Sequence, residues 1–260
     1  MIEQENIVLS ISYDGTNFRG WQAQKVPPVR SVESVLVKAI EKVANHSIQL
    51  ICAGRTDAGV HARNQVVNFF TTSERTDYSW IRGINTNLPD DCGVNAVYRA
   101  PLDFHARYSA QGRFYQYVIC NKPYRSVIDR FYTTHINYPL DVNVMQLAAN
   151  DLVGEHDFNA FRSSECQAPT SIREIFSINL HQDGDYIYID VHGNAFLHHM
   201  VRNIVGVLLK VGSGKAPTTY AKMVLESLDR KQGGVTAPAS GLFLDHIDYD
   251  WSVLTTKADG

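Results

Sequence analysis

The order of hydrophobic periods along the chain restricts its fold more than any other feature of the sequence. Period-two alternation indicates half-buried strands, and apolar stripes at helical spacing indicate amphipathic helices. In the first half, strands are expected at 7–13, 48–52, 65–71 and 94–99, and helices at 31–43 and 77–86. Ser31 is a suitable N-cap for the first helix. The first half therefore has the order β-α-β-β-α-β.

The second half repeats this order with one added helix. Strands are expected at 113–120, 172–180, 186–191 and 242–249, and helices at 141–152, 196–211 and 219–228. Asp141 caps the first of these helices, and the two middle strands form a hairpin around Asp183-Gly184-Asp185. This is the ferredoxin-like βαββαβ order used twice.

We therefore expect an α+β fold with two ferredoxin-like halves. Their antiparallel sheets would lie side by side and form a central cleft, with the helices on the outer face. The expected domains are 1–108, which carries a glycine-flanked polar loop described below, and 109–260, which completes the cleft. With 260 residues, of which 44% are hydrophobic, the chain can bury two cores of this size.

Cysteine use and the absence of targeting signals indicate a cytoplasmic protein. The four cysteines lie far apart and form no CxxC pair, which argues against a structural zinc site or a disulfide framework. The first residues lack the basic and apolar regions of a signal peptide, and no apolar run is long enough to cross a bilayer. We expect no membrane association.

The formal net charge of −3 gives no general attraction for a polyanion. Nucleic-acid binding would therefore need a local basic stretch, and one candidate runs from Arg99 to Arg130. In that stretch Asp103 and Asp129 are the only carboxylates, and aromatic residues alternate with basic ones. A soluble strand pair with charged outer faces would explain the same pattern.

The stretch AGRTDAGVHA, residues 53–62, follows an expected strand and is flanked by glycines. Gly54 and Gly59 can adopt positive φ without steric cost, which predicts a tight backbone excursion. A loop held at both ends could present Arg55, Asp57 and His61 as a reactive group. A polar turn, in which the aspartate caps its own loop, has the same composition.

Five ordered blocks of sequence resemble the TruA family of tRNA pseudouridine synthases over nearly the whole chain. They are Tyr13-Asp14-Gly15-Thr16 with Gly20-Trp21-Gln22, the loop Gly54–His61, Phe104–Tyr108, Tyr115-Gln116-Tyr117, and His199–Asn203. The resemblance implies isomerisation of uridine to pseudouridine in the anticodon arm of tRNA, at positions 38, 39 and/or 40. It also implies that no cofactor or metal is needed and that a homodimer binds the tRNA.

The same resemblance implies roles for particular residues. Asp57 would be the catalytic carboxylate, Tyr115 would lie against the target uracil, and Arg202 would support the charge of Asp57. Arg55 would enter the space left by the extruded nucleotide, and Leu242 or Leu244 would complete the apolar wall. RNA-binding residues would be Phe104, His105, Ala106, Arg107, Tyr108, Cys166 and Gln167.

Each residue also has an ordinary structural interpretation. Arg202 could lay its stem along the core with its head in water, and Tyr115 could be a cross-strand aromatic. His198 and His199 are adjacent on the expected helix and should point apart, so no metal site is predicted. Two other functions fit parts of the pattern: a non-catalytic RNA-binding module, and a metal-dependent phosphohydrolase. The second would need further carboxylates near Asp57, and the sequence offers no such cluster.

Overall fold

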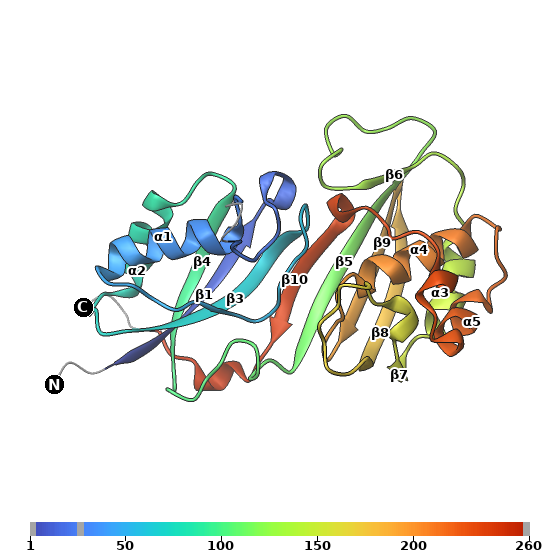
Figure 1. Ribbon diagram of the computed structural model, residues 1–260. Helices are drawn as coiled ribbons and strands as arrows, with labels where there is room; N and C mark the ends of the chain where they lie inside the picture. Colours follow the sequence, from blue (N-terminus) through green and yellow to red (C-terminus); the bar gives the residue numbers. More distant parts are fainter. Residues whose placement is uncertain (1–3, 25–28, 257–260) are drawn as a thin grey trace. The chain divides into compact units, whose positions relative to one another are not determined.

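The computed structural model describes residues 4–24 and 29–256, which form two compact units (Figure 1). The first unit holds the described residues up to Gln111 and those from Leu244 onward, and the second is Gly112–Phe243. Both units are α+β, and their strands are mostly antiparallel. This confirms the predicted fold class at the level of α+β.

The first unit is built around β1 (Glu5–Tyr13). β1 pairs antiparallel with β3 (His61–Thr71) on one side and β4 (Cys92–Ala100) on the other, and the short β2 (Ile51–Cys52) pairs with β3. The sheet order β4-β1-β3 thus places the two central strands, β1 and β3, next to each other.

Two helices, α1 (Val32–Ala44) and α2 (Asp77–Asn87), cover one face of these strands (Figure 1). Ser31 caps α1 as predicted, in a reciprocal capping box with Ser34. Phe69 of β3 meets Trp80 of α2 edge-on, with ring centroids 5.5 Å apart. Because side chains alternate along a strand, the neighbouring Asn68 points to the opposite face.

The second unit has the strand order β5-β9-β8-β7. Its strands are β5 (Gly112–Asn121), β6 (Thr134–Ile136), β7 (Gly154–Asp157), β8 (Ile172–Asp183) and β9 (Tyr186–Gly193), and β6 runs parallel to β5. The last strand, β10 (Leu242–Asp248), begins in this unit and ends in the first. Short 3₁₀ helices are η1 (Gly15–Asn17), η2 (Asn159–Phe161), η3 (Arg230–Gly233), η4 (Ala239–Gly241) and η5 (Trp251–Val253).

Three helices, α3 (Val142–Asn150), α4 (Met200–Gly212) and α5 (Tyr220–Ser227), gather on one side of this unit (Figure 1). Asp141 caps α3 as predicted. The side chain of Gln146 donates to the carbonyl of Ile178 at 2.9 Å and accepts from Leu180 N at 2.7 Å. This amide therefore bonds the backbone of β8 beyond the point where β7 ends, which protects an otherwise open strand edge.

The structure differs from the sequence prediction at several element boundaries. The strands β6 and β7 were not predicted, because runs of three and four residues are too short to show alternation. Helix α4 begins at Met200 rather than at 196, because His199 has φ 63°, which is outside the helical region. Among the described residues, none of the helices is both long and apolar enough to span a membrane.

Candidate active site

The loop from Ala53 to Val60 joins β2 to β3 and is held at its first residues. Ala53 N donates to Val66 O at 2.9 Å, and the buried Gln65 side chain donates to Gly54 O at 2.6 Å. Gly59 has φ 80°, as predicted for a tight turn. Gly54 does not have a positive φ, and a Cβ there would meet open space. The prediction that both glycines are needed for backbone geometry is therefore wrong at Gly54.

Thr56, next to the predicted catalytic residue, is bound by both segments of the sequence block that precedes the loop, 13–16 and 20–22. The hydroxyls of Tyr13 and Thr56 lie 2.7 Å apart, and both residues are buried. Trp21 N donates to Thr56 O at 3.0 Å. The backbone position of Asp57 is thus set by bonds to the residue before it.

Two glycines, one in each of these segments, allow the segments to approach the loop closely. A Cβ on Gly15 would lie 2.0 Å from the carbonyl oxygen of Val60. Gly20 has φ 85°, and a Cβ there would lie 2.9 Å from Thr56 O. Side chains are excluded at both positions, because the neighbouring atoms are backbone. Residues 13–16 and 20–22 therefore pack directly against the loop, and we call these two segments the cradle of the loop.

His61 ends the loop and is buried rather than presented. Its Nδ1 accepts from Gly15 N at 3.0 Å and lies 3.2 Å from Asp14 Oδ1. Its side chain is only 2% exposed. The expectation that His61 is displayed with Arg55 and Asp57 is therefore wrong: Arg55 is exposed, Asp57 is half-buried, and His61 anchors the loop.

The segment Phe104–Tyr108 presents only part of its predicted RNA-binding surface. Phe104 and Ala106 are buried, and the Phe104 ring packs on Tyr249 with centroids 5.3 Å apart. Arg107 and Tyr108 are exposed, and His105 Nδ1 accepts from Arg107 N at 3.1 Å. Contact of these five residues with RNA stays a prediction, in which the exposed pair would supply the charge and the stacking surface.

Arg55 and Arg107 are distant in sequence, yet both affect the pKa of the same thiol, that of Cys52. Burial raises the pKa of Cys52 to about 12, and the charge of Glu33 adds to the shift. Arg55 and Arg107 oppose that shift, because a positive charge favours the thiolate. The two guanidinium groups therefore lie within electrostatic reach of the same thiol in the first unit.

In the second unit, Tyr115 lies on β5 and is 8% exposed. It pairs in register with Val191 of β9, and its ring meets Phe196 edge-on, with centroids 5.1 Å apart and planes at 82°. Such an edge-to-face contact holds the plane of the tyrosine ring. A ring held in this way could present one face to a flat base without reordering.

Arg202 lies in the first turn of α4 and is held by the segment before β10. Its Nε donates to Ala237 O at 2.8 Å, and Ala237 N donates to Arg202 O at 3.1 Å. A Cβ on Gly206, one turn later, would lie 2.0 Å from Val235 O. The close packing of residues 235–237 on α4 therefore fixes the direction of the arginine side chain.

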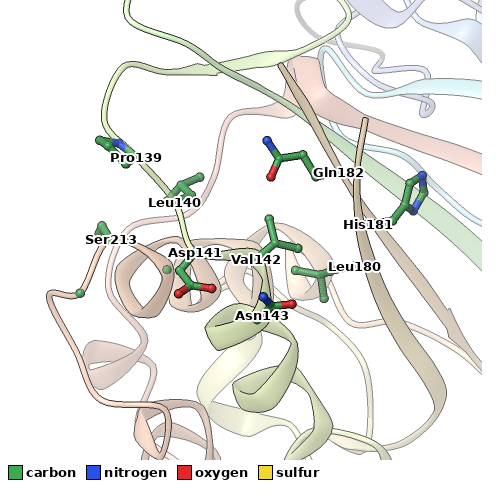
Figure 2. Close-up of a pocket in the computed structure, with 11 residues that line it drawn as sticks. Pro139, Leu140, Asp141, Val142, Asn143, Leu180, His181, Gln182 and Ser213 are labelled. Carbon is green, nitrogen blue, oxygen red and sulfur yellow. The ribbon is translucent and has the colours of Figure 1, made fainter. Parts of the chain in front are cut away.

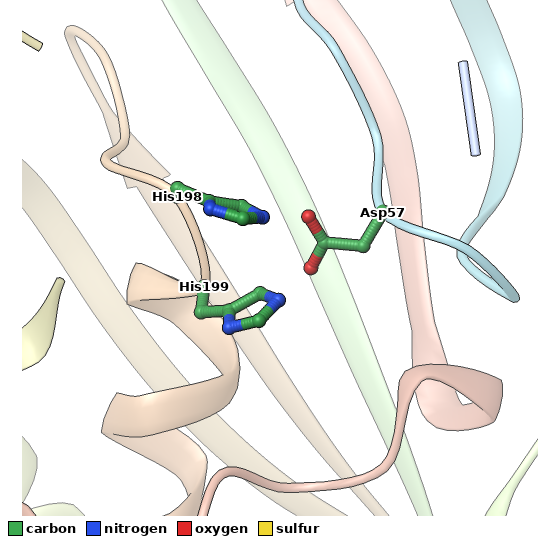
Figure 3. A group of neighbouring side chains, drawn as sticks. All are labelled: Asp57, His198 and His199. Atoms are coloured by element: carbon green, nitrogen blue, oxygen red, sulfur yellow. The ribbon is translucent and has the colours of Figure 1, made fainter. Parts of the chain in front are cut away.

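His198 and His199 lie in the turn before α4, and Figure 3 shows both rings. The centroids of the two histidine rings are only 4.1 Å apart. The expectation that these rings point apart from a helix is wrong, because the left-handed conformation of His199 ends the helical repeat. Within either unit taken alone, the described residues hold no trio of metal-ligand atoms close enough to bind an ion.

The remaining predicted residues lie close to this turn or on β10. In the loop that carries Cys166 and Gln167, Ser163 N donates to His198 O at 2.9 Å, so the loop is attached to the turn before α4. Cys166 is half-buried and Gln167 is exposed. Leu242 and Leu244 are both buried, the first in the second unit and the other in the first.

A cavity of about 720 Å³ lies elsewhere on the second unit (Figure 2). It is lined by the start of α3, the end of β8 and the end of α4, with Asp141, His181 and Gln182 among its residues. The Asp141 carboxylate already accepts a hydrogen bond from Val144 N as a helix cap. None of the predicted site residues lines this cavity, and we assign it no role in the reaction.

Comparison with known proteins agrees with the motifs. A family model described as tRNA pseudouridine synthase matches residues 9–109 and 148–250. The chain therefore belongs to the tRNA pseudouridine synthase family, and the resemblance predicted from its motifs is confirmed. Members of this family are enzymes that isomerise uridine to pseudouridine.

Individual relatives are similar over almost their whole length. The chain is 50% identical to the tRNA pseudouridine synthase A of Alcanivorax borkumensis, with 94% of this chain and 91% of that protein covered. It is 49% identical to the protein of the same name from Pseudoalteromonas atlantica, covering 94% and 92%. For the Klebsiella pneumoniae protein the identity is 47%, with 94% and 89% covered.

Removing the hydroxyl of Tyr13 tests whether the cradle sets the position of the loop. In Tyr13→Phe the buried Thr56 hydroxyl loses this partner, so we expect the free energy of unfolding to fall by about 1–3 kcal/mol. We also expect slower pseudouridine formation at saturating tRNA. Urea denaturation and single-turnover kinetics measure the two effects.

Tyr220→Phe is the matched control, since it removes a hydroxyl that accepts a hydrogen bond from Lys210 Nζ at 2.9 Å in the other unit. It should change stability without changing the single-turnover rate. Wild-type turnover in Tyr13→Phe would show that the cradle does not control the loop.

Proposed function

We propose that this chain isomerises uridine to pseudouridine in the anticodon arm of tRNA, at positions 38, 39 and/or 40. The glycosidic C–N bond breaks, the uracil rotates in its pocket, and a C–C bond forms between the base and the ribose. The proton displaced from the new bonding carbon is balanced by one gained at the released ring nitrogen. The chief support is Asp57, a half-buried carboxylate on a loop that buried hydrogen bonds hold in place.

Asp57 is proposed as the catalytic carboxylate. Three roles are consistent with an aspartate: attack on the ribose, attack on the base, and removal of a ribose proton. All require an anion at a defined position. The hydrogen bonds from Tyr13 and Trp21 to Thr56 help to fix the position of Asp57, because they restrain the adjacent peptide.

Tyr115, Arg202, Arg55 and the two leucines are proposed to bind the target nucleotide. Tyr115 would stack on the uracil, since its ring plane is held by Phe196. Arg202 would support the negative charge of the catalytic group, and Leu242 or Leu244 would supply an apolar wall. Arg55, exposed on the loop, would occupy the space that the extruded nucleotide leaves.

The domain organisation expected from the sequence is proposed as the frame of this site. In the first unit, the strand order β4-β1-β3 with β2 on β3 is consistent with a ferredoxin-like half. In the second, β5-β9-β8 is consistent with the same order. We propose that domains 1–108 and 109–260 use these halves to build a central RNA-binding cleft.

The RNA path is proposed to follow Phe104–Tyr108 and the loop of Cys166 and Gln167. Arg55 and Arg107 both influence the thiol of Cys52, which is consistent with a shared cationic surface on the first unit. Such a local surface can bind RNA although the whole chain is slightly acidic. We propose that the reaction takes place in the cytoplasm and needs no cofactor, metal or membrane.

A non-catalytic RNA-binding module is the alternative. It would need the basic and aromatic surface but not the carboxylate. Family membership and the restrained Asp57 loop favour the enzyme, because a purely binding surface gains little from an acidic side chain beside phosphate.

We also propose that the protein acts as a homodimer. The loop between β5 and β6 carries exposed apolar side chains, with Val127 64% and Ile128 81% exposed. Asp129 anchors the loop, because its carboxylate accepts from Tyr186 and Ser126, and these bonds lower the pKa of Asp129. An ordered loop with an exposed apolar tip is typical of a protein contact, and a second copy is the proposed partner.

Asp57→Asn and Asp57→Ala should both abolish pseudouridine formation and leave tRNA affinity and folding nearly unchanged. The carboxylate is needed for the reaction and contributes nothing favourable to binding a polyanion. Chemical mapping of pseudouridine in tRNA, with filter binding of the same tRNA, measures both properties. Asp90→Asn, an exposed change of the same kind in the same unit, should remain active. Turnover by Asp57→Asn would remove Asp57 from the catalytic role.

Arg107→Ala should weaken tRNA binding and make its dependence on salt less steep. If Arg107 neutralises one phosphate, the slope of log affinity against log salt should fall by about one. Arg82→Ala removes the same charge from the exposed face of α2 and should leave the slope unchanged. Equal slopes in Arg107→Ala and the wild type would place Arg107 away from the RNA.

Analytical ultracentrifugation at micromolar concentration should show a dimer for the wild type. Ile128→Glu should shift the population toward monomer, because a charge would be buried in the contact. Val235→Glu introduces the same charge at another exposed β-branched residue of the unit, 83% exposed, and should stay dimeric. A monomeric wild type, or a dimeric Ile128→Glu, would overturn this interface.

A further inference from the structure

Two buried asparagines lie on the face of the first sheet opposite α1 and α2. Asn6 of β1 is 1% exposed and Asn68 of β3 is fully buried. Asn68 Nδ2 donates to Asn6 Oδ1 at 2.8 Å. In register, Asn68 faces Val8, so the two amides are diagonal neighbours on adjacent strands. Burying an amide group costs free energy unless its polar atoms are hydrogen-bonded, so the other amide atoms of Asn6 and Asn68 should also have partners.

Those remaining atoms bind the backbone of one segment. Asn6 Nδ2 donates to Pro101 O at 2.9 Å and to Phe104 O at 3.0 Å. Asn68 Oδ1 accepts from Ala106 N at 2.9 Å. The hydroxyl of Tyr249 donates to the carbonyl of Ala106. Both polar groups of the Ala106 backbone are thus bound to side chains from distant parts of the chain.

The segment held in this way leads directly to exposed groups. Phe104 and Ala106 point inward, whereas Arg107 and Tyr108 are exposed, and Tyr108 is 76% exposed. Hydrogen bonds from buried side chains restrain the backbone at Phe104 and Ala106. The backbone direction of the next residues, Arg107 and Tyr108, is therefore restrained as well. An apolar pair at positions 6 and 68 would leave three backbone groups without these partners.

We propose that Asn6 and Asn68 are positioning residues for RNA binding, which act by holding Ala106 so that Arg107 and Tyr108 meet the tRNA. This inference rests on the proposed function, because it assigns the exposed residues to RNA contact. The asparagines themselves touch no substrate. Their effect should therefore appear in the binding of tRNA and its salt dependence, and not in the chemical step.

The test uses Asn68→Ala and Tyr249→Phe in the full-length protein with unmodified tRNA transcript. Each variant loses one hydrogen bond to Ala106, so we expect KM for tRNA to rise about fivefold. The value of kcat should stay within about twofold of the wild type, since no group that acts on the uridine is changed. The slope of log KM against log salt should become less steep, in the direction expected for Arg107→Ala.

Two controls separate positioning from a general loss of stability. Asn85→Ala removes an asparagine whose side chain binds both backbone groups of Val94 in the same unit, but not this segment. Ile84→Val trims a fully buried core residue of α2. Both should lower the free energy of unfolding in urea and leave KM and its salt slope unchanged. Tyr249→Phe keeps the aromatic ring and tests the proposal even if Asn68→Ala folds poorly.

Wild-type KM and salt slope in both Asn68→Ala and Tyr249→Phe would overturn the proposal. An equal rise of KM in the two controls would also overturn it, because the effect would then follow stability alone. Failure of the proposed function is distinct from either result: it would appear in the wild-type protein, as tRNA without pseudouridine.

Discussion

The hydrogen bond between the buried hydroxyls of Tyr13 and Thr56 is the interaction on which the rest of the candidate site depends. It joins the end of the central strand β1 to the residue before Asp57, so the sheet restrains the position of the loop. Gly15 and Gly20 make this contact possible, because any Cβ at either position would collide with the loop backbone. The side chain of Asp57 is therefore only half-buried, although the residue before it, Thr56, is buried. A catalytic group gains from such an arrangement, because little ordering is left to be done when the substrate binds.

Buried polar side chains hold irregular segments at other places in the same way. Asn68 holds the segment that leads to Arg107, as argued above. In the second unit, Asn203 donates to Phe161 O at 2.6 Å and accepts from the Thr236 hydroxyl at 2.7 Å. Asn203 follows Arg202 on α4, and so ties two loops to the helix that carries this arginine. In both cases, a polar side chain on a strand or helix binds the backbone of a segment outside the main helices and strands, which is how a regular element can specify the geometry of its connections.

Much of the fold was predictable because its signals are local. The caps at Ser31 and Asp141 and the hairpin of β8 and β9 were predicted correctly from residues near in sequence. The start of α4 was missed, because a left-handed backbone conformation is usually predicted from glycine or asparagine and position 199 is a histidine. The hydrogen bonds of Asn6 and Asn68 were also missed, because their partners lie far along the chain. A polar residue inside the apolar run Val66–Phe70 was the available signal for Asn68. The candidate site residues were chosen from the motifs, and contacts of Tyr115 and Arg202 could not be foreseen from spacing alone.

The environment of Cys52 has a consequence for the chemical durability of the protein. This thiol lies on β2, just before the proposed catalytic loop, and burial raises its pKa to about 12. Oxidants and alkylating agents react with the thiolate, which is scarce near neutral pH when the pKa is so high. Cys92 is protected in the same way, with a pKa raised to about 12 by burial. Cys52 comes shortly before the proposed catalytic loop in the sequence, and its thiol is held largely in the protonated form, which reacts slowly with oxidants.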